Sequence, residues 1–233
     1  MAEDTFDGHD TRHRLLEAAR DVFAEKGFYA ATTREICERA EANVAAVNYY
    51  FSTKENLYAE AWRKSFHDAL EKNPPDGGVP PQAPAEKRLR GRIKAMIDHV
   101  TDEENRTFRI AQKELAAPTR LLNEVQKECL RPLQQGMRQV VRELLGPAVP
   151  ERQVRFAQAS IAAQCFGLLH HIRMHREAPG AAPPPAAEII ADFDAYAEHV
   201  FRFSLAGLLA LRDSFEGSGA AAAPEAPAEG TRF

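Results

Sequence analysis

Two short helical patterns with a tight break between them constrain most strongly what this chain can fold into. They occupy residues 31–58, ATTREICERAEANVAAVNYYFSTKENLY, and in each pattern apolar side chains recur at helical spacing. Two helices joined by a turn of a few residues form a helix-turn-helix motif, whose second helix can lie in a DNA major groove. This segment therefore predicts an all-helical domain that binds DNA.

The rest of the chain has helical periodicity in almost every ordered stretch and almost none of the alternation typical of strands. The sequence therefore predicts an all-α fold. Pro132 falls inside one expected helix, and because proline lacks a backbone donor we expect a kink over residues 128–132. Helices are expected at residues 10–26, 34–40, 44–51, from a cap at 52 or 53 to 72, 86–101, 104–116, 119–145, 151–176 and 186–213.

The bulk composition excludes several classes of protein. The formal net charge is −4 and the pI is about 6.1, so nucleic-acid binding must use a local surface rather than a global basic field. No apolar run approaches the ~18 residues of a membrane span, and the acidic start lacks the apolar segment of a secretory signal. Three widely separated cysteines argue against a disulfide framework. We expect a cytoplasmic protein without a membrane partner.

Residues 11–62 resemble, without a gap, the DNA-binding domain of TetR-type transcriptional regulators, including the strings TTREI, YYF and STKENL. Within that family, NVAAVNYYF resembles the CecR-like subgroup. The later pieces KELAAPT, LRP and SIAAQC resemble that subgroup's regulatory domain more weakly. One departure is Glu41, which stands at a turn position where the family usually has glycine. A left-handed backbone at a non-glycine residue costs about 1 kcal/mol.

The resemblance implies a DNA-binding transcriptional regulator, usually a repressor, that a small-molecule effector releases from its operator. The expected fold is an N-terminal three-helix helix-turn-helix DNA-binding domain followed by a C-terminal helical regulatory and dimerisation bundle. We expect a flexible arm at 1–10, the DNA-binding domain at 11–56, the ligand-binding and dimerisation domain at 57–214, and a disordered tail at 215–233. The core of the first domain should contain Val22, Phe23, Ile36, Val47 and Phe51.

Base reading must come from small and amide side chains, because residues 44–51 contain no lysine or arginine. Asn48 can form a bidentate pair with adenine, while Ala45 and Ala46 allow close approach and can touch thymine methyl groups. Asn43 lies at the N-terminal end of this helix, where such helices meet base edges. Taken alone, Asn48 would more often be a solvated residue. The combination of features favours DNA contact.

The family resemblance assigns further contacts to the same surface. It implies that Arg34 reaches a guanine or a phosphate and that Thr33, Tyr49, Tyr50 and Lys54 contact phosphates, a role that hydroxyls and a lysine suit. Paired tyrosines alone are more often half-buried packing. The candidate DNA-binding residues are Thr33, Arg34, Asn43, Val44, Ala45, Ala46, Asn48, Tyr49, Tyr50 and Lys54.

The regulatory half predicts an effector cavity and a dimer surface. A kinked helix cannot pack flush along its length, so we expect a cavity for an apolar or aromatic small molecule beside Pro132, with Gln164 or Arg131 as a polar anchor. The alternative for each lining residue is plain core. The candidate pocket residues are Phe108, Cys129, Met137, Gln164 and Phe166.

The last two long helices carry apolar faces that a four-helix contact between two copies could bury, so we expect a homodimer on a near-palindromic operator. In the alternative, these faces pack only within the subunit. The candidate interface residues are Ile161, Leu168, Phe193, Val200, Phe201 and Leu205.

A second class of function is a helical-bundle protein that binds a small molecule or metal without binding DNA. His171 and His175 are one turn apart beside His170, which is a spacing that can hold a metal ion. However, no carboxylate completes the set, and the chain contains no Glu-x-x-His pair. We therefore expect no metal, no cofactor beyond an unidentified effector, and no enzymatic activity.

Overall fold

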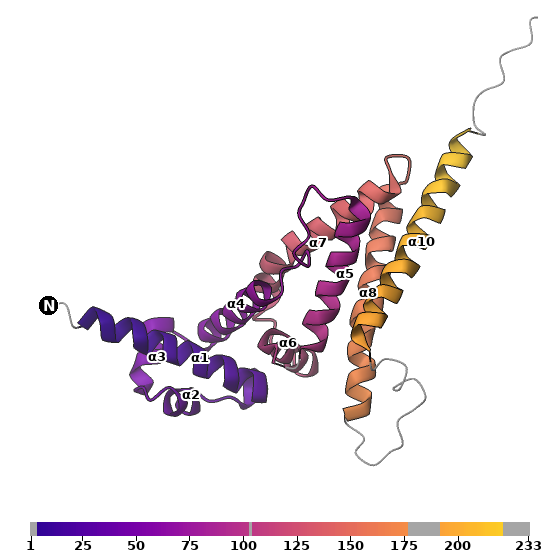
Figure 1. Cartoon of the computed structure of the whole chain (residues 1–233). Helices are drawn as coiled ribbons and strands as arrows, with labels where there is room; N and C mark the ends of the chain where they lie inside the picture. The colour runs from indigo at the N-terminus through magenta and orange to yellow at the C-terminus, as the bar shows by residue number, and fades with distance from the viewer. Residues whose placement is uncertain (1–3, 103, 177–191, 221–233) are drawn as a thin grey trace, which may run out of the picture. The chain divides into compact units, whose positions relative to one another are not determined.

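The computed structural model describes residues 4–102, 104–176 and 192–220, and all regular structure in these ranges is helical (Figure 1). The all-α prediction is therefore confirmed. None of the helices in these ranges has the length and apolar composition needed to cross a bilayer. The helices are α1 (Asp4–Ala30), α2 (Thr33–Arg39), α3 (Val44–Phe51), α4 (Lys54–Lys72), α5 (Ala85–Thr101), α6 (Arg106–Ala116), α7 (Asn123–Leu145), α8 (Glu151–Arg176) and α10 (Phe193–Ala220).

Capping side chains explain where several helices begin. The Thr53 hydroxyl accepts the Asn56 N–H at 3.2 Å, so α4 starts at the following residue, as expected. Asn105 caps α6 in the same way, accepting the Phe108 N–H at 3.4 Å, and α6 therefore begins two residues later than expected. Helix α8 begins and ends at the expected residues.

Other boundaries differ from the prediction. Helix α1 starts at Asp4, so most of the segment expected as a flexible arm is helical. Helix α7 starts at Asn123 rather than at 119, because Arg120 has a φ of 65° and a helix cannot continue through that angle. Helix α10 continues to Ala220, beyond the expected end at 213 and into the segment expected as a disordered tail. The expected helical residues 186–191 lie outside the described ranges.

Pro132 lies inside α7, which is assigned as one helix from Asn123 to Leu145. The kink at this position remains a prediction. One turn later, Gly136 packs closely against the side chain of Arg92, since a Cβ added there would lie 2.7 Å from an Arg92 Nη atom. A larger residue at 136 would displace the guanidinium.

The chain divides into two compact units. One contains the described residues of 1–78 and 95–135, and the other those of 79–94 and 136–233. The division falls inside α5 and α7, each of which contributes to both units. The domain boundary expected at residue 56 falls inside α4. The first unit contains α4 and α6 as well as the helix-turn-helix segment.

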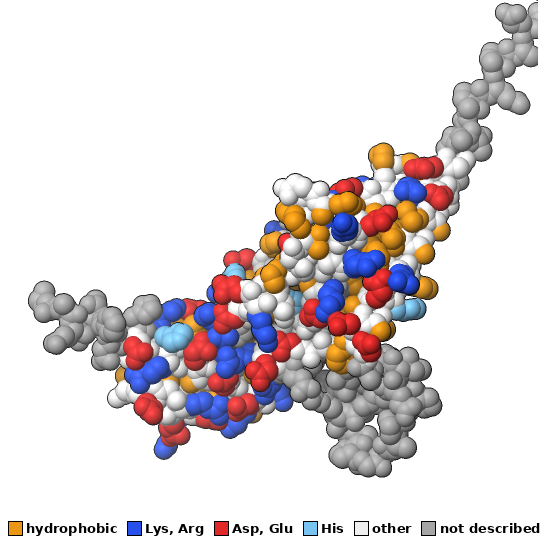
Figure 2. Space-filling view, in the orientation of Figure 1, with side chains coloured by type: hydrophobic (Ala, Val, Ile, Leu, Met, Phe, Trp, Pro, Cys, Tyr) orange, Lys and Arg blue, Asp and Glu red, His pale blue; other side chains and the backbone are white. Residues whose placement is uncertain are grey.

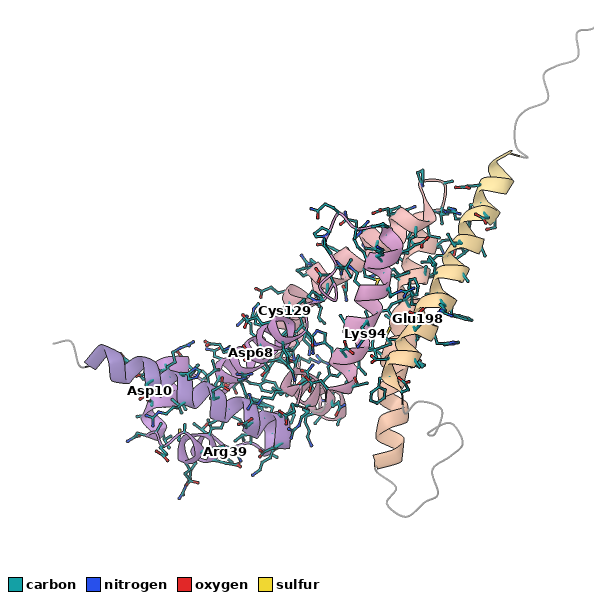
Figure 3. The ribbon with its side chains drawn as sticks, viewed as in Figure 1. Asp10, Arg39, Asp68, Lys94, Cys129 and Glu198 are labelled. Atoms are coloured by element: carbon teal, nitrogen blue, oxygen red, sulfur yellow. The ribbon has the colours of Figure 1, made fainter. Side chains whose placement is uncertain are left out.

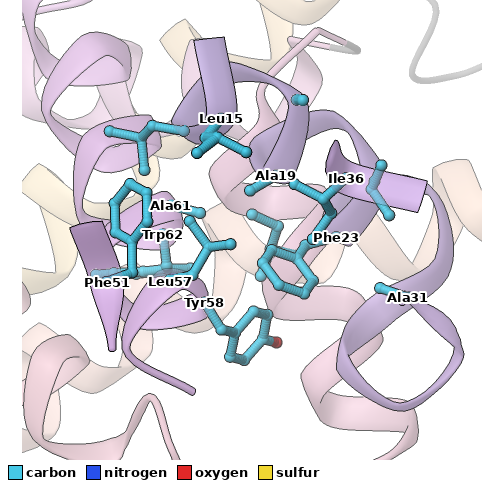
Figure 4. Packing of buried hydrophobic residues seen from close by; sticks show 14 of the residues in the cluster. Leu15, Ala19, Phe23, Ala31, Ile36, Phe51, Leu57, Tyr58, Ala61 and Trp62 are labelled. Carbon is cyan, nitrogen blue, oxygen red and sulfur yellow. The ribbon is translucent and has the colours of Figure 1, made fainter. Parts of the chain in front are cut away.

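The core of the first unit is apolar and rich in aromatic rings (Figure 4). Phe23 and Tyr58 meet edge to face with their ring centroids 4.8 Å apart, a geometry that aromatic pairs favour. Each large side chain buried here contributes about 1.5–3 kcal/mol relative to an exposed position. All five predicted core residues are buried, which confirms that prediction: Val22, Phe23, Ile36, Val47 and Phe51.

In the second unit, α8 and α10 pack side by side (Figure 1). The Tyr196 hydroxyl of α10 donates to the Gln164 carbonyl oxygen of α8 at 3.0 Å. Two ion pairs join α5 to α10, Arg90 to Glu198 at 3.2 Å and Lys94 to Asp194 at 2.8 Å (Figure 3 labels Lys94 and Glu198). The Arg90 guanidinium also lies 4.4 Å from the centroid of the Phe201 ring. These contacts hold three helices together within one chain.

This packing involves four of the six residues predicted for the dimer surface. Ile161, Leu168, Val200 and Phe201 are all buried in the single chain, so they form the contact between α8 and its neighbours rather than a free surface. Phe193 and Leu205 are only partly exposed. Periodicity shows that a helix has an apolar face but does not show which helix covers it, so the dimer interface remains a prediction.

Among the described residues, the large apolar side chains that α8 and α10 expose are not the predicted interface residues. Phe156 and Phe166 on α8 are 51% and 45% exposed, and Phe203 on α10 is 65% exposed. A second copy of the chain can contact these rings without unfolding the unit.

Candidate DNA-binding surface

Helix α2 begins where a threonine satisfies its first free amides. The Thr32 hydroxyl accepts the Glu35 N–H at 3.1 Å, which makes Thr32 the N-cap and places Thr33 in the first turn. Ile36 and Cys37 face the core and are buried, whereas Arg34 and Glu38 face solvent. The motif therefore presents Arg34 at the start of α2, as expected.

The turn between α2 and α3 contains a residue in a left-handed conformation. Glu41 has a φ of 50°, and the next amide, that of Ala42, donates to the Cys37 carbonyl oxygen at 2.9 Å. Asn43 then caps α3, because its side-chain oxygen accepts the Ala45 N–H at 2.9 Å. Thus Glu41 adopts the angle for which the family usually has glycine, and Asn43 has a structural task in addition to any contact with DNA.

Helix α3 has one buried and one exposed face. Val47 and Phe51 are buried in the core, and on the opposite side Val44 and Asn48 are exposed. Tyr49 is the most exposed aromatic residue of the helix, at 80%. The exposed residues Val44, Ala45, Asn48 and Tyr49 recur at i, i+1, i+4 and i+5, so they share one face that can enter a groove.

Two predicted contact residues of α3 are only partly available. Ala46 and Tyr50 pack against the core and are half-buried. The Tyr50 ring meets the Tyr49 ring at 84° with centroids 4.8 Å apart. Tyr50 therefore supports the exposed ring of Tyr49, while its partial exposure still allows a contact at the edge of the surface.

The two cations of the predicted surface have partners inside the chain. Arg34 Nε lies 2.8 Å from a Glu38 carboxylate oxygen, one helical turn away, and this carboxylate raises the pKa of the guanidinium. Lys54 Nζ donates to the carbonyl oxygens of Phe28 and Ala31, both at 2.6 Å, and lies 4.3 Å from the Phe28 ring centroid. Burial lowers the pKa of the Lys54 ammonium. Lys54 thus ties α4 to the end of α1.

Sequence reasoning missed these partners. The Arg34–Glu38 pair had a sequence signal, because opposite charges four residues apart on a helix are neighbours. The carbonyl partners of Lys54 had none, because they follow from how α1 ends. Helix geometry breaks at Gly27, whose φ of 75° and ψ of 179° are non-helical, and the carbonyls beyond it are free to accept a side-chain donor. The helix expected to end at residue 26 is thus interrupted at the next residue, although α1 as a whole runs to Ala30.

The five predicted pocket residues fall in both units. Phe108 and Cys129 belong to the first, and Met137, Gln164 and Phe166 to the second. Met137 is buried, Phe166 is half-exposed, and the Gln164 amide lies 3.4 Å from the Ser204 hydroxyl. The pocket they were expected to form remains a prediction.

A different, open depression of about 310 Å³ lies on α7 and is lined by Asn123, Gln126, Lys127, Leu130, Arg131 and Gln134. It includes Arg131, one of the two predicted polar anchors. The described residues contain no cluster of histidine, cysteine or carboxylate side chains that could hold a metal ion. The side chains of His170, His171 and His175 lie outside the described part of the structure.

A capped α2, a tight turn and an exposed face on α3 define a helix-turn-helix protein with an all-helical C-terminal part. Comparison with known families agrees. The model of bacterial regulatory proteins of the TetR family matches residues 15–61. The model of the C-terminal domain of the HTH-type transcriptional dual regulator CecR matches residues 85–208, more than half of the chain. The chain therefore belongs to the TetR family and carries a CecR-type C-terminal domain.

Individual relatives are similar mainly in the DNA-binding segment. The chain is 46% identical to CecR of Shigella flexneri over 54 residues, which are 23% of this chain and 24% of that protein. It is 38% identical to UidR of Escherichia coli K12 over 47 residues, 20% of this chain and 24% of that protein. The matched segments span about a quarter of the length of these curated relatives.

Solved structures share the fold over nearly the whole chain. FadR from Bacillus subtilis, in complex with stearoyl-CoA, aligns over 84% of this chain and 98% of its own with a TM-score of 0.63 and 18% identity. A transcriptional regulator from Rhodococcus sp. Rha1 aligns over 85% and 96% with a TM-score of 0.59 and 23% identity. At these identities the likeness establishes the fold alone.

Replacing Glu41 by glycine should stabilise the protein. The left-handed angle at this position is strained for a residue with a Cβ but not for glycine, so we expect a gain of up to about 1 kcal/mol in the free energy of unfolding. Urea unfolding followed by circular dichroism measures it. Glu41→Ala is the matched control, because it removes the same carboxylate and keeps the strain. An equal gain in both variants would assign the effect to charge instead.

Proposed function

We propose that this protein is a transcriptional regulator, acting as a repressor, that binds a near-palindromic operator as a homodimer through α3. The observation that carries this proposal is the exposed face of α3, where Val44, Ala45, Asn48 and Tyr49 stand clear of a packed core. Two such helices related by a two-fold axis must reach successive major grooves, about 34–36 Å apart. The spacing between the two copies then decides whether the protein can hold its operator.

The residues of this surface divide into two roles. Asn48 and Ala45 on the exposed face are suited to read base edges, Asn48 by a bidentate pair with adenine. Thr33, Tyr49 and Tyr50 carry hydroxyls that suit phosphate oxygens, which fix register without reading sequence. Arg34 can serve in either role after leaving Glu38. Lys54 can contact a phosphate only through donor capacity that its two carbonyl partners leave unused.

Asn48→Ala should relax the preference for one base pair in each half-site. A bidentate amide–adenine pair discriminates by about 1–3 kcal/mol, so operator affinity should fall by that amount while affinity for unrelated duplex changes little. Selection of duplexes from a random library by native and variant protein measures the preference. Tyr49→Phe is the comparison, because loss of a phosphate contact should weaken all duplexes alike. Unchanged base preference in Asn48→Ala would remove the base-reading role.

The homodimer should use the exposed rings of α8 and α10 rather than the buried faces. Phe203→Asp places a charge on this surface without entering the core, so we expect a monomer that loses operator affinity. Light scattering at micromolar concentration and a mobility shift assay measure both properties. Leu115→Asp, at an 83% exposed position on α6, is the control and should leave the dimer intact. A monomeric native protein would contradict the proposal outright.

The effector is proposed to be an apolar or aromatic small molecule with polar groups, bound among α4, α5, α6 and their neighbours. Trp62 Nε1, His99 Nε2 and Thr107 Oγ1 are buried on these helices and have no hydrogen-bond partner among the described residues. Buried polar atoms nearly always have a hydrogen-bond partner, so a ligand with polar groups could supply the partners of these three atoms. The related fold of FadR from Bacillus subtilis was solved with stearoyl-CoA, a small molecule with a long apolar chain.

Trp62, the only tryptophan, should report effector binding. It is 2% exposed and stacks on Phe66, so a ligand that contacts its indole should change its fluorescence. The same ligand should weaken operator binding by about 1–3 kcal/mol, and operator should weaken ligand binding by the same factor. Fluorescence titrations with and without operator measure both factors. Ligands that bind but leave operator affinity unaltered would refute the regulatory role of the site.

A further inference from the structure

The basic side chains of the DNA-binding segment are all engaged within the chain. Residues 10–61 contain seven lysines and arginines and nine aspartates and glutamates, so the segment that must approach a polyanion is itself slightly acidic. Each of these cations has a carboxylate or carbonyl partner. The pairs are Arg12 with Glu60, Arg14 with Asp10, Arg20 with Glu17 and Asp68, Lys26 with Glu35, Arg34 with Glu38, Arg39 with Glu25, and Lys54 with the carbonyls of Phe28 and Ala31.

Among the described residues of this segment, each cation therefore lies beside an acceptor rather than apart from one. Figure 2 shows lysine and arginine side chains interleaved with aspartate and glutamate over the α1–α3 part of the face in view. Non-specific binding of proteins to DNA depends almost entirely on cations that neutralise phosphates and release counterions. A surface whose cations are already paired gains less from a random duplex, because each phosphate contact first requires a carboxylate to be displaced.

These pairs differ in how easily they exchange. Arg20 is only 5% exposed, donates to the Ser65 hydroxyl at 3.0 Å and lies 2.7 Å from Asp68, so leaving these partners would disrupt the core. The side chains of Arg34 and Glu38 are 83% and 64% exposed. An exposed ion pair at i, i+4 stabilises a helix only weakly, so a phosphate or a guanine can replace the carboxylate. Among the predicted contact residues, Arg34 is thus the cation whose partner can be displaced.

We propose that Glu38 is a specificity-determining residue, which holds Arg34 away from DNA until α3 fits its operator. On an unrelated duplex the complex keeps the Arg34–Glu38 pair. One phosphate contact scarcely exceeds the cost of breaking this pair and of leaving the Glu38 carboxylate close to the DNA phosphates. On the operator, the base contacts of α3 fix the protein close to the groove, and Arg34 exchanges partners. Glu38 thereby penalises wrong sequences more than the right one, which is one route to discrimination.

This inference rests on the proposed function and makes a distinct claim about salt dependence. The slope of log affinity against log salt steepens by about 0.9 for each phosphate contact on duplex DNA. Freeing Arg34 should therefore add one contact to the non-specific complex, which lacks it, and none to the operator complex, which already has it. The two duplexes should respond differently to the same substitution.

The experiment compares Glu38→Gln with Glu41→Gln. Both variants remove one exposed carboxylate near the turn, but only the first removes the ion-pair partner of a cation, since Glu41 forms no ion pair that the described structure records. Glutamine keeps the size of the side chain, so the fold should be preserved, and circular dichroism checks this. Each protein is titrated across a KCl series with a duplex selected by the native protein and with a scrambled duplex of the same length and composition.

For Glu38→Gln we expect affinity for the scrambled duplex to rise about three- to tenfold, with a slope steeper by about 0.9, and affinity for the selected duplex to rise less than about threefold with no change in slope. Glu41→Gln should change both duplexes slightly and equally. Adding Arg34→Ala to Glu38→Gln should cancel the gain on the scrambled duplex.

Several results would overturn the inference: unchanged slopes on both duplexes, equal steepening on both, or the same response from Glu41→Gln. In each of these cases a native protein that still prefers its selected duplex leaves the proposed function intact. A native protein that selects no duplex at all would instead remove the proposed function, and this inference with it.

Discussion

The side chain of Tyr58 joins the three helices on which the DNA-binding surface depends. Tyr58 lies on α4 and is fully buried. The centroid of its ring is 4.8 Å from that of Phe23 and 5.2 Å from that of Phe28, and both of these residues belong to α1. Its hydroxyl donates to a Glu114 carboxylate oxygen of α6 at 3.0 Å. Burial, with the nearby Glu114 charge, raises the pKa of Tyr58, so the phenol stays protonated and remains a donor. Glu114 also accepts the backbone amides of Thr119 and Arg120, at 2.7 and 3.0 Å.

The contacts of Tyr58 continue through neighbouring residues to the start of α2. The Phe28 ring that meets Tyr58 also lies under the ammonium of Lys54, which in turn holds the carbonyl of Ala31, one residue before the cap of α2. A continuous series of packed and hydrogen-bonded groups thus runs from the end of α6 to the start of the helix-turn-helix. Networks of packed and hydrogen-bonded groups of this kind are the physical medium of coupling between sites in proteins.

Sequence alone predicted the parts of this protein that local chemistry controls. The start of α4 followed from its cap, and the break in α1 after residue 26 from the conformational freedom of glycine, because caps and breakers act over a few residues. The resemblance supplied the role of α3 and the unusual backbone at Glu41. The contacts that the sequence does not show depend on distant partners: α8 packs against α10, and Lys54 binds carbonyls more than twenty residues away. The predicted start of α7 was wrong for a similar reason. Glu114 of the preceding helix accepts hydrogen bonds from the Thr119 hydroxyl and the Arg120 amide, which hold these residues outside the helix.

The cap at the start of α3 restricts the reading of DNA by the side chain that forms it. Asn43 commits its amide oxygen to the Ala45 N–H, and losing that bond would cost about 1 kcal/mol of helix stability. The cap occupies one of the two lone pairs of that oxygen, so the amide keeps its N–H donors and one acceptor site, and the cap fixes the orientation of both. An adenine, which presents one acceptor and one donor in the major groove, needs both halves of an amide. A paired contact of Asn43 with adenine would therefore have to use the one orientation that the cap allows. Asn48 lies inside the helix and does not cap it, so its side chain carries no such restriction.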